Sequence, residues 1–464
     1  MNFKYILIIF SCCMIFNSAC KSDQKKENLP VNDFQIGIIV DNIKINANSS
    51  ESFCVYLPEQ YKVQKDLPLM IFLDPKAAGV RTLRKYSALA EKYGYIFVAS
   101  NFSRNGIAYQ LIEQHIDKLI EKINNVISYD RKRIYMAGFS GGARVAQTYA
   151  TNNSSIVGII MCSAGFAEDF GANKLHYDLF AIAGFKDFNY NEIVGLELNF
   201  PDSVIEHHFS YFSDKHKWPP IVNIDEALLF FSLGAMKKNL ISKNQILINN
   251  EINLLNAKIQ RNQENNALTY KNLALYEKMI HFFGGLFDMN EYKILYDELK
   301  NTKEIKDYVK KRYDLIAVED KMKSYYVEKI QTENTKWWIE EIAKINKSII
   351  SSKDENDSLM KLRVLGYMSL VSFMASEQAL NQKNIPASEH FITIYKLVDE
   401  INPDYNYLLA RLAMLKGDEM AAIKQIGLAI EKGFEEPDKL RNTKVFGDLT
   451  NKPEWLNLIK SIKE

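Results

Sequence analysis

Residues 133–150, RIYMAGFSGGARVAQTYA, carry the pattern of a buried strand that passes through a glycine-rich turn directly into a helix. The strand is expected over residues 134–137 and the helix from about Ala143. Between them stands the pentapeptide GFSGG, with Ser140 at its centre. A G-x-S-x-G turn of this kind holds its serine in a strained backbone conformation, so the neighbouring residues need almost no side chain. The stretch restricts the chain to folds in which a buried strand turns sharply into a helix.

Strand and helix patterns alternate around this turn. An antiparallel pair is expected over residues 34–57, at a sheet edge. The further expected strands are residues 67–73, 95–99, 134–137, 156–162, 179–184 and 204–212, and the further expected helices are residues 82–93, 108–127 and 225–238. This alternation predicts an α/β fold, with a doubly wound, mostly parallel sheet covered by helices on both faces. Functional groups then belong at the C-terminal ends of the strands.

The pattern changes after about Lys238, where Lys-, Glu- and Asn-rich helical segments begin and no convincing strand follows. A chain of 464 residues is too long for one ordinary core. We therefore expect an α/β domain over residues 34–238 and an all-helical domain over residues 239–464. Within the helical domain a tetratricopeptide-like repeat is expected near residues 387–434, and residues 362–398 are a candidate for a degenerate earlier one. These helices are a candidate surface for a protein partner.

The N-terminus has the pattern of an export signal. Lys4 precedes an apolar run over residues 5–16, which is too short to cross a bilayer as a helix. Small residues then precede Cys20, and a polar tether follows over residues 21–33. Residues 1–20 resemble a bacterial lipoprotein signal, which implies lipidation of Cys20 and a membrane-anchored protein of the cell envelope. Asn17 departs from that pattern, and an ordinary secretory signal is the alternative.

Charge and cysteine content exclude several function classes. A net charge of +1 provides no electrostatic footprint for nucleic acid, so no nucleic-acid partner is expected. Cys54 and Cys162 are the cysteines that remain beyond Cys20, and both lie in apolar strand patterns that are typical of small buried hydrophobes. We expect no disulfide framework, no metal site and no organic cofactor.

Ser140 needs partners if it is a nucleophile, because its hydroxyl is almost fully protonated at neutral pH. In a fold of this kind an acid and then a histidine follow the nucleophile, each at a strand end. His216 follows the strand over residues 204–212 and is the predicted base, and Asp187 follows the strand over residues 179–184 and is the predicted acid. The competing acids are Asp169, Asp178, which lies at the wrong end of its strand, and Asp214.

Two backbone N–H groups are candidates to stabilise an oxyanion. One belongs to Gly141 at the helix N-terminus, and the other to Lys76 after the strand over residues 67–73, because Pro75 has no N–H to give. The candidate substrate-binding residues are Asn101, Arg104, Phe139 and Trp218. For the two polar residues simple solvation is the alternative, and for the two aromatic residues core packing is the alternative.

Residues 34–238 resemble an α/β-hydrolase domain, in particular the compact esterases related to feruloyl esterases and polyhydroxybutyrate depolymerases. The matching segments are GFSGG with Ser140, GFKDFNY with Asp187 and HKWPP with His216. The sequence DPK at residues 74–76 departs from the HG-type oxyanion motif of those proteins, and Asp214-Lys215 stands where Gly-Gly is usual. The short spacing between the three segments leaves little room for an inserted lid, so we expect an open site.

The resemblance implies a serine hydrolase that cleaves a carboxylic ester through an acyl-enzyme on Ser140. The substrate is expected to be a small-molecule or polymer-linked ester. Two other functions stay open at this point. One is a serine peptidase that uses the same three residues, and the other is a non-catalytic interaction lipoprotein of the cell envelope whose helical repeats hold a partner.

Overall fold

The computed structural model describes residues 34–47, 49–167, 175–200, 205–265 and 269–462. The expected signal, Cys20, the tether and Asp169 lie outside these ranges. None of the helices within them is both long and apolar enough to cross a membrane.

One eight-stranded sheet organises the N-terminal half of the chain, in the order β1-β2-β4-β3-β5-β6-β7-β8. The pairs β1/β2 and β2/β4 are antiparallel and the other five pairs are parallel. This arrangement confirms the predicted mostly parallel sheet with an antiparallel edge. The strands are β1 Ile39–Lys44, β2 Ser52–Tyr56, β3 Leu69–Leu73, β4 Ile96–Ser100, β5 Ile134–Phe139, β6 Ile156–Cys162, β7 Asp178–Gly184 and β8 His207–Phe212.

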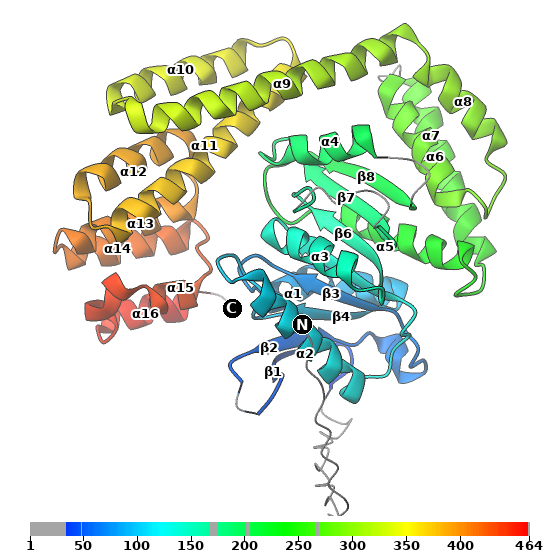
Figure 1. Cartoon of the computed structure of the whole chain (residues 1–464), viewed down its shortest axis with the longest axis horizontal. Helices are drawn as coiled ribbons and strands as arrows, with labels where there is room; N and C mark the ends of the chain where they lie inside the picture. The colour runs from blue at the N-terminus through cyan, green and yellow to red at the C-terminus, as the bar shows by residue number, and fades with distance from the viewer. Residues whose placement is uncertain (1–33, 48, 168–174, 201–204, 266–268, 463–464) are drawn as a thin grey trace, which may run out of the picture.

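Helices cover both faces of the sheet (Figure 1). Side chains of β5 alternate between them: Tyr135 and Ala137 join one hydrophobic cluster, and Ile134 and Met136 join the other. The first cluster includes α1 (Gly79–Tyr93) and α5 (Ile221–Lys237), and the second includes α2 (Tyr109–Val126), α3 (Gly141–Asn152) and α4 (Tyr190–Asn199). A doubly wound sheet follows from this period-two alternation of apolar side chains.

The described residues from 245 onward contribute helices and no strand to the sheet. These helices are α6 Gln245–Glu264, α7 Thr269–Phe283, α8 Asn290–Lys300, α9 Lys303–Thr332, α10 Thr335–Ser351, α11 Glu355–Asn381, α12 Ile385–Asp399, α13 Pro403–Leu415, α14 Glu419–Glu431, α15 Pro437–Asn442 and α16 Pro453–Ser461. The described residues also include the 3-10 helices η2 Glu59–Lys62 and η4 Lys444–Leu449. The helical C-terminal region is therefore as predicted, whereas the position of the domain boundary at residue 238 stays a prediction.

The hydrophobic core does not end at residue 238. Ile248 of α6 and Phe282 of α7 are fully buried in the same cluster as Phe180 of β7 and Phe230 of α5. The Phe282 ring lies 5.3 Å from that of Phe230, centroid to centroid. Helices α6–α8 thus extend the core behind one face of the sheet.

Residues 303–462, from α9 to the C-terminal end of the described chain, form an arm that arches over the sheet. Figure 1 shows α9 crossing above α4 and β8, and the helices from α11 to α16 descending beside the sheet. At the end of the arm Glu435 contacts Arg81 at 2.8 Å and Glu436 contacts Lys76 at 2.6 Å. Near its start, Arg312 of α9 donates to the hydroxyl of Tyr190 at 3.1 Å, so the arm contacts the α/β part near both of its ends.

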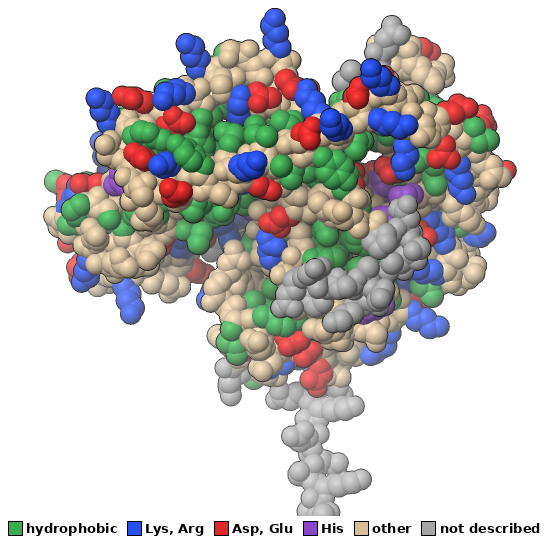
Figure 2. All heavy atoms as spheres, turned by 45° about the horizontal axis from the view of Figure 1, so that its top comes forward, with side chains coloured by type: hydrophobic (Ala, Val, Ile, Leu, Met, Phe, Trp, Pro, Cys, Tyr) green, Lys and Arg blue, Asp and Glu red, His purple; other side chains and the backbone are tan. Residues whose placement is uncertain are grey.

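Within the arm, α13 and α14 form a helical hairpin, and Gly417 in the turn between them has a φ of 79°. Ala410, Ala422 and Ile426 of this hairpin are fully buried. The tetratricopeptide-like assignment stays a prediction. Figure 2 shows hydrophobic side chains gathered over the arm among Lys, Arg, Asp and Glu side chains.

Candidate active site

Ser140 occupies the sharp turn between β5 and α3. Its φ of 53° and ψ of −119° place a non-glycine residue in a region that side chains rarely adopt. Its N–H donates to the carbonyl of Cys162 at 2.8 Å, and its own carbonyl accepts from Ala143 at 3.0 Å. The turn is tight because a Cβ on Gly138 would lie 2.2 Å from the Gly142 carbonyl oxygen. The glycines are therefore needed to let the strand, the turn and the helix approach one another.

Three predicted residues meet at this turn. Oγ of Ser140 lies 3.0 Å from Nε2 of His216, and Nδ1 of His216 lies 2.8 Å from Oδ1 of Asp187. They come from the C-terminal ends of β5, β8 and β7 respectively, which are the positions that a parallel sheet offers for chemistry. The arrangement is a continuous hydrogen-bonded chain from hydroxyl to imidazole to carboxylate.

The Asp187 side chain is fully buried. Its Oδ1 also accepts the N–H of Asn189 at 2.8 Å, whereas Oδ2 has no hydrogen-bond partner among the residues that the structure describes. Asn189 in turn donates from Nδ2 to the carbonyl of Ser163 at 2.9 Å. The carboxylate is thus fixed in position and directed at His216.

His216 lies between two aromatic rings. The Phe188 ring stacks on the imidazole with centroids 4.1 Å apart, and the Phe139 ring lies 4.7 Å away on a tilted plane. The imidazole keeps 18% of its side-chain surface exposed. These contacts limit rotation of the ring and leave Nε2 directed at Ser140.

The competing acids in the described chain do not contact His216. Oδ2 of Asp178 pairs with Lys238 at 2.6 Å at the start of β7, and burial raises the pKa of this carboxyl. Oδ1 of Asp214 accepts the N–H of Lys215, and its other oxygen pairs with Lys217. Neither carboxylate is available to the imidazole, and Asp169 lies outside the described residues.

The loop after β3 does not present the expected second oxyanion donor. The N–H of Lys76 donates to Oδ1 of Asp74 at 2.8 Å, and the N–H of Ala78 donates to the same oxygen at 3.2 Å. The N–H of Ala77 donates to the carbonyl of Asp74 at 3.1 Å. Because Asp74 engages all three groups, the structure argues against the role that was expected for Lys76. The sequence DPK folds into a self-contained turn here.

The N–H of Gly141 stays a predicted oxyanion donor. It lies at the N-terminus of α3, directly after Ser140, where helix N–H groups have no intrahelical acceptor. Among the described residues it makes no hydrogen bond, so it is available to a negative charge that develops beside Ser140.

The four candidate substrate-binding residues occupy different environments. Asn101 donates from Nδ2 to Asp41 at 2.9 Å, which ties it to β1, and Arg104 is exposed in the same loop. Phe139 is 9% exposed beside His216. Trp218 donates from Nε1 to Oδ2 of Asp74 at 2.6 Å and packs against Phe139. Trp218 therefore links the His216 loop to the β3 loop.

The arm contributes contacts that the sequence analysis missed. Arg363 of α11 donates to the carbonyl of Phe185 at 2.9 Å, and Lys323 of α9 donates to the carbonyl of Phe188 at 2.7 Å. Both carbonyls belong to the loop that carries Asp187. The two cations share the buried carboxylate of Glu319, at 2.7 Å each. The loop that holds the acid is therefore supported from outside the sheet by helices more than 130 residues further along the chain.

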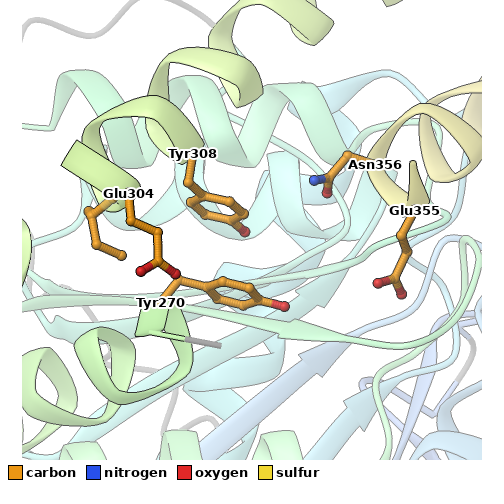
Figure 3. Close-up of a pocket in the computed structure, with 6 residues that line it drawn as sticks. Tyr270, Glu304, Tyr308, Glu355 and Asn356 are labelled. Atoms are coloured by element: carbon orange, nitrogen blue, oxygen red, sulfur yellow. The ribbon is translucent and has the colours of Figure 1, made fainter. Parts of the chain in front are cut away.

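Two open pockets lie away from this site. One, of about 250 Å³, is lined by Tyr270, Glu304, Ile305, Tyr308, Glu355 and Asn356, and Figure 3 shows the parallel rings of its two tyrosines. The other, of about 460 Å³, lies around Tyr61 and Tyr129. Neither is lined by Ser140, Asp187 or His216.

Cys54 and Cys162 are free and buried, and burial raises the pKa of both thiols. No group of three or more His, Cys, Asp or Glu side chains in the described ranges could hold a metal ion.

Comparison with known proteins gives a likeness of fold. No protein-family model matches the chain, and a search of curated proteins returns no match. Among solved structures, a feruloyl esterase module from Clostridium thermocellum is 17% identical and covers 42% of this chain and 87% of its own, with a TM-score of 0.35. A fluorophosphonate-binding serine hydrolase from Staphylococcus aureus is 16% identical. The match covers 42% of this chain and 98% of that protein, with a TM-score of 0.34. Esterase B from Lactobacillus rhamnosis is 12% identical. The match covers 44% of this chain and 87% of that protein, with a TM-score of 0.36. Each of these similarities covers less than half of this chain.

Proposed function

We propose that the protein is a serine hydrolase that cleaves carboxylic esters, with Ser140 as the nucleophile, His216 as the general base and Asp187 as the acid. The observation that carries the proposal is the hydrogen-bonded chain of 3.0 Å and 2.8 Å that links these residues. It ends on a serine whose strained φ of 53° exposes the hydroxyl above the strand ends. Such strain is retained in a fold only where the surrounding structure compensates for it, and it concentrates at functional sites.

The reaction follows from the geometry. Oγ of Ser140 attacks the ester carbonyl carbon while Nε2 of His216 takes the hydroxyl proton. Asp187 stabilises the resulting imidazolium through Nδ1 and keeps the ring in the required tautomer. The C–O bond to the alcohol then breaks, and His216 returns the proton to the leaving oxygen. A water molecule repeats the sequence on the acyl-enzyme and releases the carboxylic acid.

The oxyanion that forms in each step needs hydrogen-bond donors at the turn. The N–H of Gly141 points from the start of α3, where the positive end of the helix dipole adds to its effect. One such donor supplies about 3 kcal/mol of transition-state stabilisation in a serine hydrolase. We propose Gly141 as the first donor of this oxyanion hole.

Fluorophosphonate labelling of the chain without residues 1–20 tests the proposal, because these reagents modify activated serines. We expect the parent to be labelled and both Ser140→Ala and His216→Ala to lose labelling. Ser155→Ala is the matched control, since Ser155 is exposed just before β6, at the opposite end of the strands. A folded parent that stays unlabelled refutes the proposal.

Acyl esters of increasing chain length, compared with the corresponding anilides, then distinguish ester from amide cleavage. We expect turnover of the esters, because the alkoxide leaving group needs less protonation than an amine. Faster cleavage of the anilides would favour the peptidase alternative instead.

We further propose that Cys20 carries a lipid and anchors the protein in the bacterial cell envelope. The support is the sequence pattern of residues 1–20, in which an apolar run and two small residues precede Cys20. Metabolic incorporation of an alkyne fatty acid tests this, with Cys12→Ser as control. Incorporation that survives Cys20→Ser refutes the anchor.

A further inference from the structure

The loop after β4 brings a carboxamide against the turn that holds Ser140. A Cβ built on Gly141 would lie 2.0 Å from Oδ1 of Asn105, 3.0 Å from its Cγ and 3.5 Å from its Nδ2. Asn105 therefore lies beside the residue whose N–H follows the nucleophile. A Cβ at residue 141 would overlap the carboxamide, which would then have to move.

The β3 loop does not offer a free backbone N–H to an oxyanion beside Ser140. The N–H groups of Lys76, Ala77 and Ala78 are all engaged by Asp74. The N–H of Gly141 is the first donor proposed for the oxyanion. A developing negative charge beside Ser140 therefore needs a second donor from elsewhere.

The loop that carries Asn105 is held rigidly at its start. Oγ of Ser100 accepts the N–H groups of Phe102 at 3.1 Å and Ser103 at 2.9 Å. The same oxygen lies 2.9 Å from Nε2 of His115, whose Nδ1 lies 3.0 Å from Glu51. Burial lowers the pKa of His115, which keeps the ring neutral so that its Nε2 accepts the Ser100 proton. Since Ser100 and His115 are fully buried, this second serine–histidine–carboxylate chain positions a loop instead of reacting.

The end of the loop is tied to the β3 turn. The N–H of Asn105 donates to the carbonyl of Pro75 at 2.9 Å, and Arg104 forms a β-bridge with Lys76. The backbone of Asn105 is thus held by the β3 turn, whereas its side chain is exposed and its carboxamide forms no hydrogen bond with the described residues. An amide that is free at this place can bind an oxyanion without first breaking an existing hydrogen bond.

We propose that Nδ2 of Asn105 is the second oxyanion donor, and that it replaces the backbone N–H of the β3 loop. Oδ1 is the atom nearer to Gly141, and a half-turn about the Cβ–Cγ bond exchanges it with Nδ2. The negative oxygen of the tetrahedral intermediate selects the N–H₂ orientation, because the carbonyl oxygen would repel it. This inference rests on the proposed hydrolase function.

Three variants of the chain without residues 1–20 test the inference with a cleaved acyl ester. Asn105→Ala removes the amide and Asn105→Asp replaces it with an isosteric carboxylate that cannot donate at neutral pH. Gln110→Ala is the control, because Gln110 is an exposed carboxamide in the first turn of α2. We expect kcat to fall about 100- to 1,000-fold in both Asn105 variants, with little change in KM. In the control we expect no change in either constant.

Affinity for an alkyl boronic acid provides the second readout, because boronates form a tetrahedral anion on the active serine. We expect both Asn105 variants to lose affinity by a factor similar to the loss in kcat. An Asn105→Asp variant with parental kcat and boronate affinity shows that Asn105 serves only as packing and overturns the inference alone. A parent that is neither labelled nor active overturns the hydrolase function together with this inference.

Discussion

Nδ1 of His216 lies 2.8 Å from an oxygen of Asp187 that is fully buried. The second oxygen of that carboxylate has no partner in the described chain, so the interaction with the imidazole is the principal charged contact of the acid. A histidine held in this way keeps its proton on Nδ1 and presents Nε2 as an acceptor. The tautomer that a nucleophilic Ser140 needs is therefore set by Asp187.

Replacing Asp187 with asparagine keeps the shape of the side chain but removes its charge and offers an N–H₂ group to the imidazole. We expect kcat for ester hydrolysis to fall about 10⁴-fold without unfolding, because the wrong tautomer of His216 is favoured. Steady-state kinetics and circular dichroism measure the two effects. Asp214→Asn is the control, since the Asp214 carboxylate accepts the N–H of Lys215 and pairs with Lys217. Equal kcat values in both variants would remove Asp187 from the reaction.

Gly141→Ala tests whether the contact with Asn105 matters for activity. The new Cβ overlaps the end of a side chain and not the backbone, so the carboxamide moves and the fold is kept. We expect a loss of kcat similar to that of Asn105→Ala. In the double variant the two losses should not add, because the amide that Gly141→Ala displaces is already absent. Fully additive losses would show that Gly141→Ala acts through its own N–H.

Arg363→Met tests the support that the arm gives to the Asp187 loop. The change removes the donor to the Phe185 carbonyl and leaves the fully buried Glu319 with Lys323 as its remaining partner. We expect a loss of about 3 kcal/mol in the free energy of unfolding, measured in urea, and a lower kcat. Arg441→Met is the matched control, because its pair with Asp438 is exposed and contributes less than about 1 kcal/mol. Equal stability of the two variants would contradict the supporting role.

Glu277 on α7 makes stability depend on pH in a direction that can be checked. Burial, with the nearby charge of Glu197, raises the pKa of its carboxyl to about 7. The folded state therefore favours the protonated form of Glu277. The stability that this preference contributes is fully present below pH 4.5 and is lost as the pH rises through 7. We expect Glu277→Gln to be more stable than the parent at pH 8 by about 1–2 kcal/mol, after allowance for partial solvent contact.

Urea unfolding at pH 4.5 and pH 8 measures this difference, which should shrink at the lower pH. Glu291→Gln on α8 is the control, because Glu291 is exposed. The stability of this variant should equal that of the parent at both pH values. A Glu277→Gln variant that is less stable than the parent at pH 8 would show that the carboxyl is ionised and paired in the folded state.

The positions of Ser140, Asp187 and His216 could be predicted because each depends on local sequence. A glycine-rich pentapeptide marks the turn, and the order of residues in a parallel sheet places the acid and the histidine at later strand ends. The strands were located for a similar reason, since β3 and β6 are continuous apolar runs. Helix α4 was missed because its ten residues include Gly195 and show little helical periodicity.

The missed contacts depend on side-chain geometry or on distant parts of the chain. The engagement of Lys76 follows from the rotamer of Asp74, which no periodicity encodes. The approach of Asn105 to Gly141 arises where the loops after β4 and β5 meet above β3, the strand between them. The support from Arg363 joins residues 178 positions apart. Sequence pattern determines which elements form, whereas packing of the whole chain determines which loops meet.

The ion pairs of Lys76 with Glu436 and of Arg81 with Glu435 join the β3 loop and the start of α1 to residues more than 350 positions later. During synthesis the sheet therefore exists for some time without its last contacts, because the N-terminal part of a chain emerges and folds first. Maturation of the site is delayed until the C-terminal helices have been made. A chain that is cut short before residue 435 has all of its proposed catalytic residues but lacks the far support of the arm.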